Sequence, residues 1–486
     1  MLFLRPFSQR VLTLVLAVTM VASPLRADDL PELGDIASSE LSLATEKKIG
    51  LQIMHEIRWR DASYLDDADV ENYLNQIGNR LVALSADPGL GFYFFPINDN
   101  SINAFAMPGG YIGIHTGLLL AAQSESELAG VMEHEISPVT KRHIERQVFQ
   151  TRHMSMASML AIGLALLGAR SNSQVASAAI ATTEAGAISA QLAFSRDFER
   201  EADRIGFETL RKAGFDVRGM AIFFERLQRS ARLYENNATA YLRTHPLSGE
   251  RMADMQNRDQ ALPYKQVPDS QEFQLVRAKL RAQQGTAADA VKDLEKLLVE
   301  RKFASEGAIR FGLAMAQMRA RNWSAAEKEL LAARQLKVSV AMLDRQLAEV
   351  KLAKGEVDAG LTLYREAMLR YPLNLAVVYG YGQALIGAKR FAEALKFAEA
   401  QSQNYPQDVR LHKMRAESYA GLGKPAQQHL ALSEVFLLQG QTMGAIEQLN
   451  IAQRSGDADF YTMSTIDSRQ RELKRRLLEE QKERRN

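Results

Sequence analysis

The sequence contains no cysteine among its 486 residues. This absence excludes structural disulfides and metal sites built from thiolates, so a metal ion would have to be held by His, Asp or Glu. A chain of this length can bury a large core without disulfide bonds, and their absence is therefore compatible with an exported protein.

The sequence also lacks an excess of charge of either sign, because 60 Lys and Arg residues face 58 Asp and Glu residues. The resulting net charge of +2 gives no reason to expect a nucleic-acid partner. The length exceeds that of one ordinary domain, so we expect at least two domains.

Long hydrophobic runs are scarce. The first, Val11 to Ala22, follows Arg5 and Arg10 and precedes small residues that end at Ala27. Its 12 residues are too few to cross a bilayer, which takes about 20. The pattern predicts a signal peptide over residues 1–27 and a periplasmic location, with a membrane anchor as the alternative.

A second apolar run, residues 154–169, is also too short for a membrane span. We expect a buried helix there. The alternative is a segment that touches lipid or gates a cleft, which is the basis for expecting a possible peripheral contact with the membrane.

The chain divides into two parts that differ in pattern. Residues 28–262 hold a glycine-rich, strand-like stretch and most of the histidines, whereas residues 268–486 are almost wholly helical in pattern. Pro263 and Pro268 mark the linker between them.

The C-terminal part repeats with a period of 34 residues, as shown by the columns Trp323, Val357, Phe391 and Ala326, Gly360, Ala394. This period is typical of tetratricopeptide helix pairs, in which small residues let neighbouring helices pack closely. We therefore predict an all-α solenoid with a concave surface for protein partners. A non-repeating helical bundle is the alternative.

The N-terminal part contains the stretch VMEHEISPVTKRH, in which His134 and Glu135 begin an H-E-x-x-H pattern. Ser124 or Ser126 is a candidate N-cap for the helix that carries it. In the complete motif, histidines at positions i and i+4 share one helical face and bind zinc, and the Glu acts on a metal-bound water. Here the fifth position is Pro138.

A second helical segment, FSRDFEREADRIGFETL, places Glu199 and Asp203 four residues apart on one face. A carboxylate there could bind the metal, and its neighbour could support a ligand through a hydrogen bond. Alone the pattern is typical of a solvated helix, and it gains meaning only together with the His-Glu pair.

Three stretches in order, NAFAMPGGYIGIHTGLL, ELAGVMEHEISPVTKRH and SRDFEREAD, resemble the metallopeptidases that include the CAAX prenyl proteases and the bacterial HtpX-type heat-shock protease. Together with the expected signal peptide and the repeats, the chain resembles the periplasmic beta-barrel assembly-enhancing proteases. The resemblance implies a mainly α fold, with a gluzincin-like metallopeptidase domain of helices and a small sheet, followed by the tetratricopeptide solenoid.

The resemblance also implies a role for each matching residue. His134 and Glu199 match zinc ligands, Glu135 matches the general base, and Asp203 matches an assisting acidic residue. His245 matches a histidine that can reach the metal and block the water position. One Zn²⁺ per chain is the implied cofactor.

The resemblance further implies a substrate-binding edge and a set of partners. The strand Tyr111 to His115 matches the edge that holds an extended substrate by β-augmentation. The implied role is quality control of outer-membrane β-barrel proteins, either helping their assembly or degrading stalled ones, with the assembly machinery and its clients as partners.

Pro138 departs from the family pattern, because proline offers no donor atom to a metal. Inside a helix it also clashes with the carbonyl of His134 and costs about 3 kcal/mol, so we expect a disturbed helix. In one alternative Ser137 caps a new helix that starts at Pro138. His143 could then replace the missing ligand. Independently of such a restart, His245 could complete a set with His134 and Glu199.

We therefore expect proteolysis to be lost or strongly reduced, while the fold and docking survive. The chain would then be a periplasmic zinc metallopeptidase whose proteolysis is reduced, or a pseudoprotease that binds clients as a chaperone or adaptor. A purely structural repeat adaptor is the third possibility, and it leaves the Glu199–Asp203 pair unexplained.

Overall fold

The computed structural model describes residues 42–142, 196–233, 241–242, 245–260 and 267–483. The expected signal peptide, the apolar run 154–169 and the candidate ligand His143 lie outside these residues. Among the helices that are described, none is both long and apolar enough to span a membrane.

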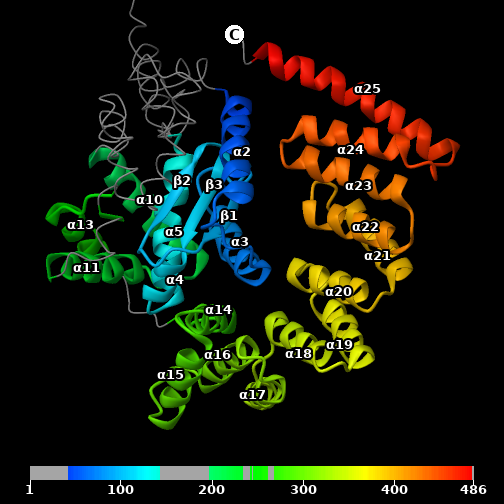
Figure 1. Ribbon diagram of the computed structural model, residues 1–486. Helices are drawn as coiled ribbons and strands as arrows, with labels where there is room; N and C mark the ends of the chain where they lie inside the picture. The colour runs from blue at the N-terminus through cyan, green and yellow to red at the C-terminus, as the bar shows by residue number, and fades with distance from the viewer. Residues whose placement is uncertain (1–41, 143–195, 234–240, 243–244, 261–266, 484–486) are drawn as a thin grey trace, which may run out of the picture.

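The N-terminal part packs helices on a small sheet, while the C-terminal part is a curved solenoid of helices (Figure 1). The elements of the N-terminal part are α2 (Leu43–Arg60), α3 (Ala68–Val82), β1 (Tyr93–Ile97), β2 (Ala104–Met107), the 3-10 turn η3 (Pro108–Gly110), β3 (Tyr111–His115), α4 (Thr116–Ala121), α5 (Glu125–Thr140), α10 (Arg196–Ala213), α11 (Arg218–Leu233) and α13 (Gly249–Gln260).

The sheet has three strands in the order β1-β3-β2, with β1 parallel and β2 antiparallel to β3. The prediction that Tyr111–His115 is an edge strand is therefore wrong, because this strand is β3 and lies in the middle. The outer side of β1 is partly covered by a bridge from Tyr64 to Ile97. Among the described residues, no strand pairs with the outer side of β2, which makes it the open edge.

Helix α5 is the centre of the N-terminal part, and it contacts β2, α3, α10 and α11. Ser124 is its N-cap, as predicted, and its hydroxyl accepts from the Glu127 N–H at 3.2 Å. Leu128, Val131 and Ile136 are fully buried on its sides. Packing on every side therefore stabilises a helix whose sequence contains a proline.

The expected disturbance at Pro138 is wrong, since α5 continues through it and ends at Thr140. Ser137 lies inside the helix and does not cap a new one. The reason is position: Pro138 occupies the last turn, so only the bond to the His134 carbonyl is lost. At the C-cap, the Lys141 N–H still bonds to the Ser137 carbonyl at 3.0 Å.

The solenoid pairs successive helices, and its period matches the sequence repeat. Its elements are α14 (Gln271–Ala282), α15 (Ala287–Val299), α16 (Glu306–Arg319), α17 (Trp323–Gln335), α18 (Ala341–Ala353), α19 (Val357–Arg370), α20 (Leu375–Gly387), α21 (Phe391–Asn404), α22 (Val409–Gly421), α23 (Pro425–Leu438), α24 (Thr442–Arg454) and α25 (Phe460–Glu483).

The repeat columns fall at equivalent places in three helices. Trp323, Val357 and Phe391 are the first residues of α17, α19 and α21. At Gly360 an added Cβ would lie 2.7 Å from the Leu352 side chain of the paired helix α18. A small residue is therefore needed there, as the sequence pattern predicts.

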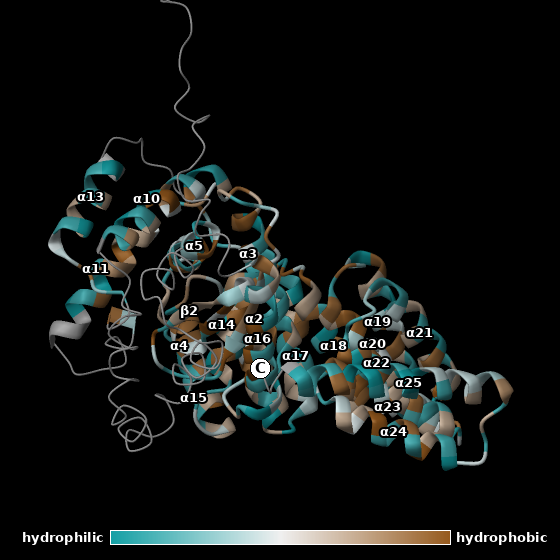
Figure 2. Ribbon diagram, turned by 90° about the horizontal axis from the view of Figure 1, so that it is seen from above, coloured by the Kyte–Doolittle hydropathy of each residue, from teal (hydrophilic) through white to brown (hydrophobic). Residues whose placement is uncertain are grey.

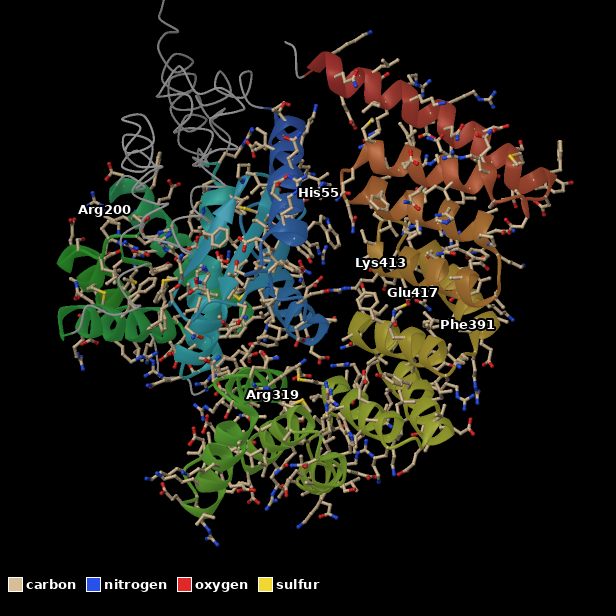
Figure 3. All side chains as sticks on the ribbon, viewed as in Figure 1. His55, Arg200, Arg319, Phe391, Lys413 and Glu417 are labelled. Atoms are coloured by element: carbon tan, nitrogen blue, oxygen red, sulfur yellow. The ribbon has the colours of Figure 1, made fainter. Side chains whose placement is uncertain are left out.

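The solenoid leaves the N-terminal part at α14 and curves past α3 and α2 (Figures 1 and 2). Its far half also reaches α2, where Lys413 Nζ lies 5.2 Å from the centre of the Trp59 ring. Gly440, with φ 73°, packs so closely on His55 that an added Cβ would lie 2.6 Å from Nδ1. Figure 3 shows His55 and Lys413 on the facing sides of the two parts.

Cations from three repeats meet the start of α3, at a segment that we call the acidic turn (Asp66, Asp67, Asp69 and Glu71). Lys279 Nζ of α14 lies 2.7 Å from Asp69 Oδ2, and Arg345 Nη2 of α18 lies 2.6 Å from the same atom. Arg410 of α22 contacts Glu71 at 3.1 Å and also pairs with Asp66. These ion pairs join the solenoid to the N-terminal part.

Candidate metal centre

Two helices and one segment bring a polar cluster into the core of the N-terminal part. Helix α5 supplies His134 and Glu135, and α10 supplies Glu199 and Asp203. His245 lies just before α13. All five side chains are at most 3% exposed. The structure thus brings together every site residue predicted from the sequence within the described part of the chain.

Asp203 orients the first imidazole. Its Oδ1 lies 3.1 Å from His134 Nδ1, which donates its proton to the carboxylate and leaves the Nε2 lone pair pointing into the cluster. Arg251 of α13 holds Asp203 in turn, with Nε at 2.7 Å from Oδ2 and Nη2 at 2.8 Å from Oδ1. Such carboxylate–histidine pairs are the usual outer support of a metal-binding histidine.

Glu135 supports the second imidazole in the same way. Its Oε1 lies 3.4 Å from His245 Nε2, and it accepts from the Tyr241 hydroxyl at 3.3 Å. A proton on Nε2 leaves the lone pair of His245 on Nδ1. Both imidazoles therefore have a carboxylate on their outer nitrogen.

The two inner nitrogens, His134 Nε2 and His245 Nδ1, face each other at 3.2 Å. Glu199 completes a triangle, with Oε2 at 3.3 Å from His134 Nε2 and Oε1 at 3.0 Å from His245 Nδ1. Ligand atoms around a tetrahedral zinc ion are roughly 3.3 Å apart, because each lies about 2.0–2.1 Å from the metal. The observed separations fit such a set.

One buried atom also fits a metal. Glu199 Oε2 has no hydrogen-bond partner among the described residues, although Arg251 Nη1 lies 2.7 Å away as an ion pair. His134, Glu199 and His245 offer ligand atoms that all lie within 4.8 Å of one another. The donor types, two imidazoles and a carboxylate, suit a zinc ion.

The electrostatics of the cluster favour positive charge at its centre. Burial lowers the pKa of His134, but Glu199 and Asp203 outweigh it and raise the pKa to about 10. Burial raises the pKa of Glu199, but His134 and His245 outweigh it and hold the pKa well below its usual range. A cation, either a proton or a metal ion, is therefore stabilised between these groups.

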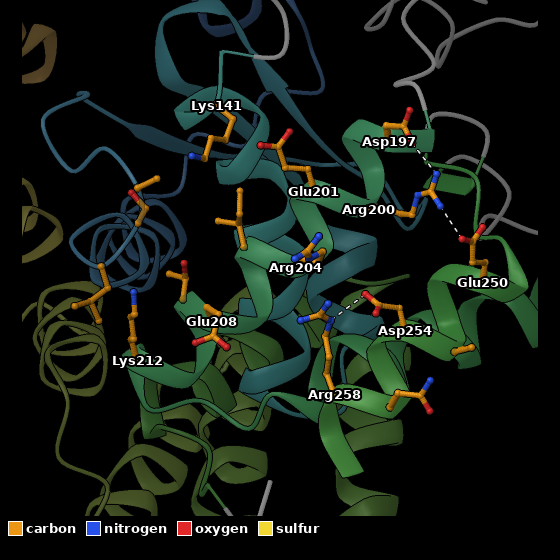
Figure 4. A pocket seen from close by; sticks show the side chains of 17 residues that line it. Lys141, Asp197, Arg200, Glu201, Arg204, Glu208, Lys212, Glu250, Asp254 and Arg258 are labelled. Carbon is orange, nitrogen blue, oxygen red and sulfur yellow. Dashed lines mark hydrogen bonds and ion pairs between the residues drawn. The ribbon is translucent and has the colours of Figure 1, made fainter. Parts of the chain in front are cut away.

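The five side chains of the cluster are almost fully buried. A hollow of about 1130 Å³ lies instead on the outer faces of α10 and α13, and no residue of the cluster lines it (Figure 4). Its lining is strongly charged, and Arg200 there pairs with Asp197 and Glu250 at 2.6 Å each.

Sequence reasoning missed Tyr241, Arg251 and Glu133. Arg251 follows His245 by six residues in THPLSGER, and a buried carboxylate needs such a partner, but the sequence alone does not show that Asp203 is buried. Pro138 is buried in α5 and supplies no donor atom. His245 lies with His134 and Glu199 in a group that could hold a metal ion.

Comparison with known proteins agrees with this geometry. The profile of Peptidase family M48 matches residues 68–259, and that of the tetratricopeptide repeat matches residues 351–417. The chain is 31% identical over 421 residues to the "Putative beta-barrel assembly-enhancing protease" of Vibrio cholerae, covering 86% of this chain and 87% of the relative. The chain belongs to the beta-barrel assembly-enhancing protease family.

Two further relatives are similar to this chain over different shares of its length. The "Beta-barrel assembly-enhancing protease" of Escherichia coli strain K12 is 31% identical, with 91% of each chain covered. The "Mitochondrial metalloendopeptidase OMA1" of Schizosaccharomyces pombe is 28% identical and matches 47% of this chain and 64% of its own. The resemblance and the fold class predicted from the motifs are confirmed, and the metallopeptidase family implies a bound metal.

Proposed function

We propose that this chain acts in the periplasm in the assembly and quality control of outer-membrane β-barrel proteins, as a metal-binding member of its family with little or no proteolysis. The relatives' names, which refer to enhancing β-barrel assembly, support the biological role. The short distances between the donor atoms of His134, Glu199 and His245 support the proposed metal binding.

His134 Nε2, Glu199 and His245 Nδ1 would hold the metal, which supplies a Lewis acid when bound. Asp203 and Glu135 fix the tautomers of the two imidazoles. A general base must be free to take a proton from water, but Glu135 already accepts from Tyr241 and faces His245. Retaining His245 in the cluster therefore keeps Glu135 from acting as a base.

Of the three possibilities that the sequence left open, the burial of the cluster favours the client-binding chaperone or adaptor. The proposed contacts with clients are the open edge of β2 and the surface of the solenoid, which need no chemistry at the metal. The metal would then hold α5, α10 and the His245 segment together.

Metal content and cleavage, measured on the same purified protein, test this proposal. We expect one zinc ion per chain and no chelator-sensitive cleavage of an unfolded substrate such as casein. His245→Ala should lose the metal, because it leaves two donors. The double variant Pro138→His with His245→Ala restores three donors and frees Glu135, so it should regain both zinc and cleavage.

Two results would overturn the proposal. Chelator-sensitive cleavage by the unaltered chain would show that Glu135 works as a base despite His245. If the unaltered chain binds no metal, or if His245→Ala binds as much metal as the unaltered chain, the assigned ligand set is wrong.

A further inference from the structure

Tyr241 is a buried residue that touches the cluster without belonging to the donor set. Its ring stacks on the His245 ring, with centroids 4.6 Å apart and planes 23° apart. Its hydroxyl donates to Glu135 Oε1 at 3.3 Å. One side chain therefore contacts both the third donor and the carboxylate behind that donor.

The stacking sets the plane of the His245 ring. Rotation of the imidazole about χ2 would turn Nδ1 away from Glu199, from which it is now 3.0 Å. The same rotation would separate Nε2 from Glu135, now 3.4 Å away. A flat aromatic neighbour at stacking distance opposes this rotation through contact over the whole ring face.

The hydroxyl holds Glu135 in place behind His245. Burial, followed by the charge of Glu135, raises the pKa of Tyr241 well above its usual value, so the hydroxyl keeps its proton and donates. Without this bond, that carboxylate oxygen would keep His245 Nε2, at 3.4 Å, as its polar neighbour within the described residues.

Each imidazole thus has a carboxylate beside its outer nitrogen, and a different type of residue holds each carboxylate. Behind His134 stands Asp203, held by Arg251. Behind His245 stands Glu135, held by Tyr241. The backbone also ties His245 to Tyr241, because the His245 N–H donates to the Tyr241 carbonyl at 2.9 Å.

We infer that Tyr241 is the positioning residue that makes His245 a metal ligand in this chain, by fixing the ring through stacking and fixing Glu135 through its hydroxyl. This inference rests on the metal site proposed above. It assigns no contact between Tyr241 and the metal.

The test measures zinc affinity of the full chain by competition with a chromophoric chelator. Tyr241→Phe keeps the stacked ring and loses the hydroxyl, whereas Tyr241→Leu loses both. Supports of this kind typically change metal affinity by 10–100-fold. We therefore expect about a 10-fold loss for Tyr241→Phe and a loss nearer 100-fold for Tyr241→Leu.

Phe223→Leu is the matched control, because Phe223 is a buried aromatic of α11 in the same core and packs on Phe224. It should lower the melting temperature without changing zinc affinity more than about 2-fold. The visible spectrum of the Co²⁺-loaded protein gives a second signature, and it should change for both Tyr241 variants and stay the same for Phe223→Leu.

The outcomes separate this inference from the function it rests on. If the unaltered chain binds no zinc, both fail. If it binds zinc and the Tyr241 variants bind as well as Phe223→Leu does, the metal site stands and the role of Tyr241 is overturned. Should Tyr241→Leu not fold, Tyr241→Phe alone decides, since unchanged affinity and spectrum in that variant contradict the inference.

Discussion

Glu133, one residue before His134, is a buried carboxyl group that the metal cluster does not use. Ser137 donates to its Oε1 at 3.3 Å, while Oε2 has no hydrogen-bond partner among the described residues. Burial raises the pKa of Glu133 to about 8, against weaker opposing effects of Thr209 and Ser137. At neutral pH this group is therefore a neutral acid in the folded protein.

The raised pKa of Glu133 makes stability depend on pH. The folded state keeps the proton up to pH 8, whereas the unfolded chain loses it near 4.5. The stabilising effect of the proton is therefore complete below the unfolded value and is lost as pH rises toward the folded value. The loss amounts to at most about 1.4 kcal/mol per pH unit.

Glu133→Gln removes this titration and keeps the shape of the side chain. We expect the variant to gain stability relative to the unaltered chain as pH rises from 5 to 8, with no further gain above 8, in urea unfolding at a series of pH values. Glu208→Gln, on the exposed side of α10, is the control and should show no such trend. A constant difference between Glu133→Gln and the unaltered chain would contradict the assignment.

At the scale of elements, the open edge of β2 is the place where we propose that an extended client adds a strand. The Asn103 carbonyl accepts from the His115 N–H, and hydrogen-bonded pairs alternate along an antiparallel ladder. With Ala106 opposite Ile112, the Ala106 N–H therefore points outward, away from β3. No strand of the described part of the chain pairs there, so we expect this N–H to donate to an added strand.

Ala106→Pro removes this outward donor and none of the bonds to β3. We expect binding of an unfolded client peptide to weaken at least 5-fold, measured by fluorescence anisotropy, with little change in melting temperature. Ala106→Val is the control, because it keeps the donor and favours a strand. Equal binding by the two variants would show that clients use another surface.

The sequence predicts features of single helices and repeats when the residues that determine them are close together in the chain. The cap at Ser124 and the small residue at Gly360 follow from contacts within one helix or one repeat. The central position of β3 could not be predicted, because strand order depends on pairing between distant segments. The effect of Pro138 was overestimated, since propensity takes no account of the packing around α5.

Some residues of the candidate site could be predicted from the sequence, and others could not. The motifs identify His134, Glu135, Glu199 and Asp203, because spacing on a helix places them on defined faces. The part played by Tyr241 and Arg251 depends on three-dimensional contacts between segments up to 106 residues apart. No spacing in the sequence indicates those contacts.

At the scale of the whole molecule, the acidic turn decides how the solenoid sits on the N-terminal part. Burial raises the pKa of Asp69, but Arg345 and Lys279 outweigh it and hold the pKa well below its usual range. The sequence shows these three residues as ordinary surface charges, because 210 and 276 residues separate Asp69 from its partners.

Asp69→Asn leaves Lys279 and Arg345 without their shared anion. Removing one partner of a buried ion pair costs about 3–5 kcal/mol. We expect a lower melting temperature and a larger radius of gyration in X-ray scattering, as the solenoid loosens from α3. Glu366→Gln, in an exposed pair within α19, should change neither. An unchanged radius of gyration for Asp69→Asn would show that apolar contacts alone hold the two parts.

The acidic turn also has a consequence for the order in which the chain matures. Its last cation, Arg410, comes 344 residues after Asp66. At a synthesis rate of about 5–20 residues per second, Arg410 is made roughly 20–70 s after Asp66. Lys279 and Arg345 are made before Arg410, so the acidic turn is only partly neutralised until α22 exists, and the docking of α22 on this turn is a late folding step that only a nearly complete polypeptide can take.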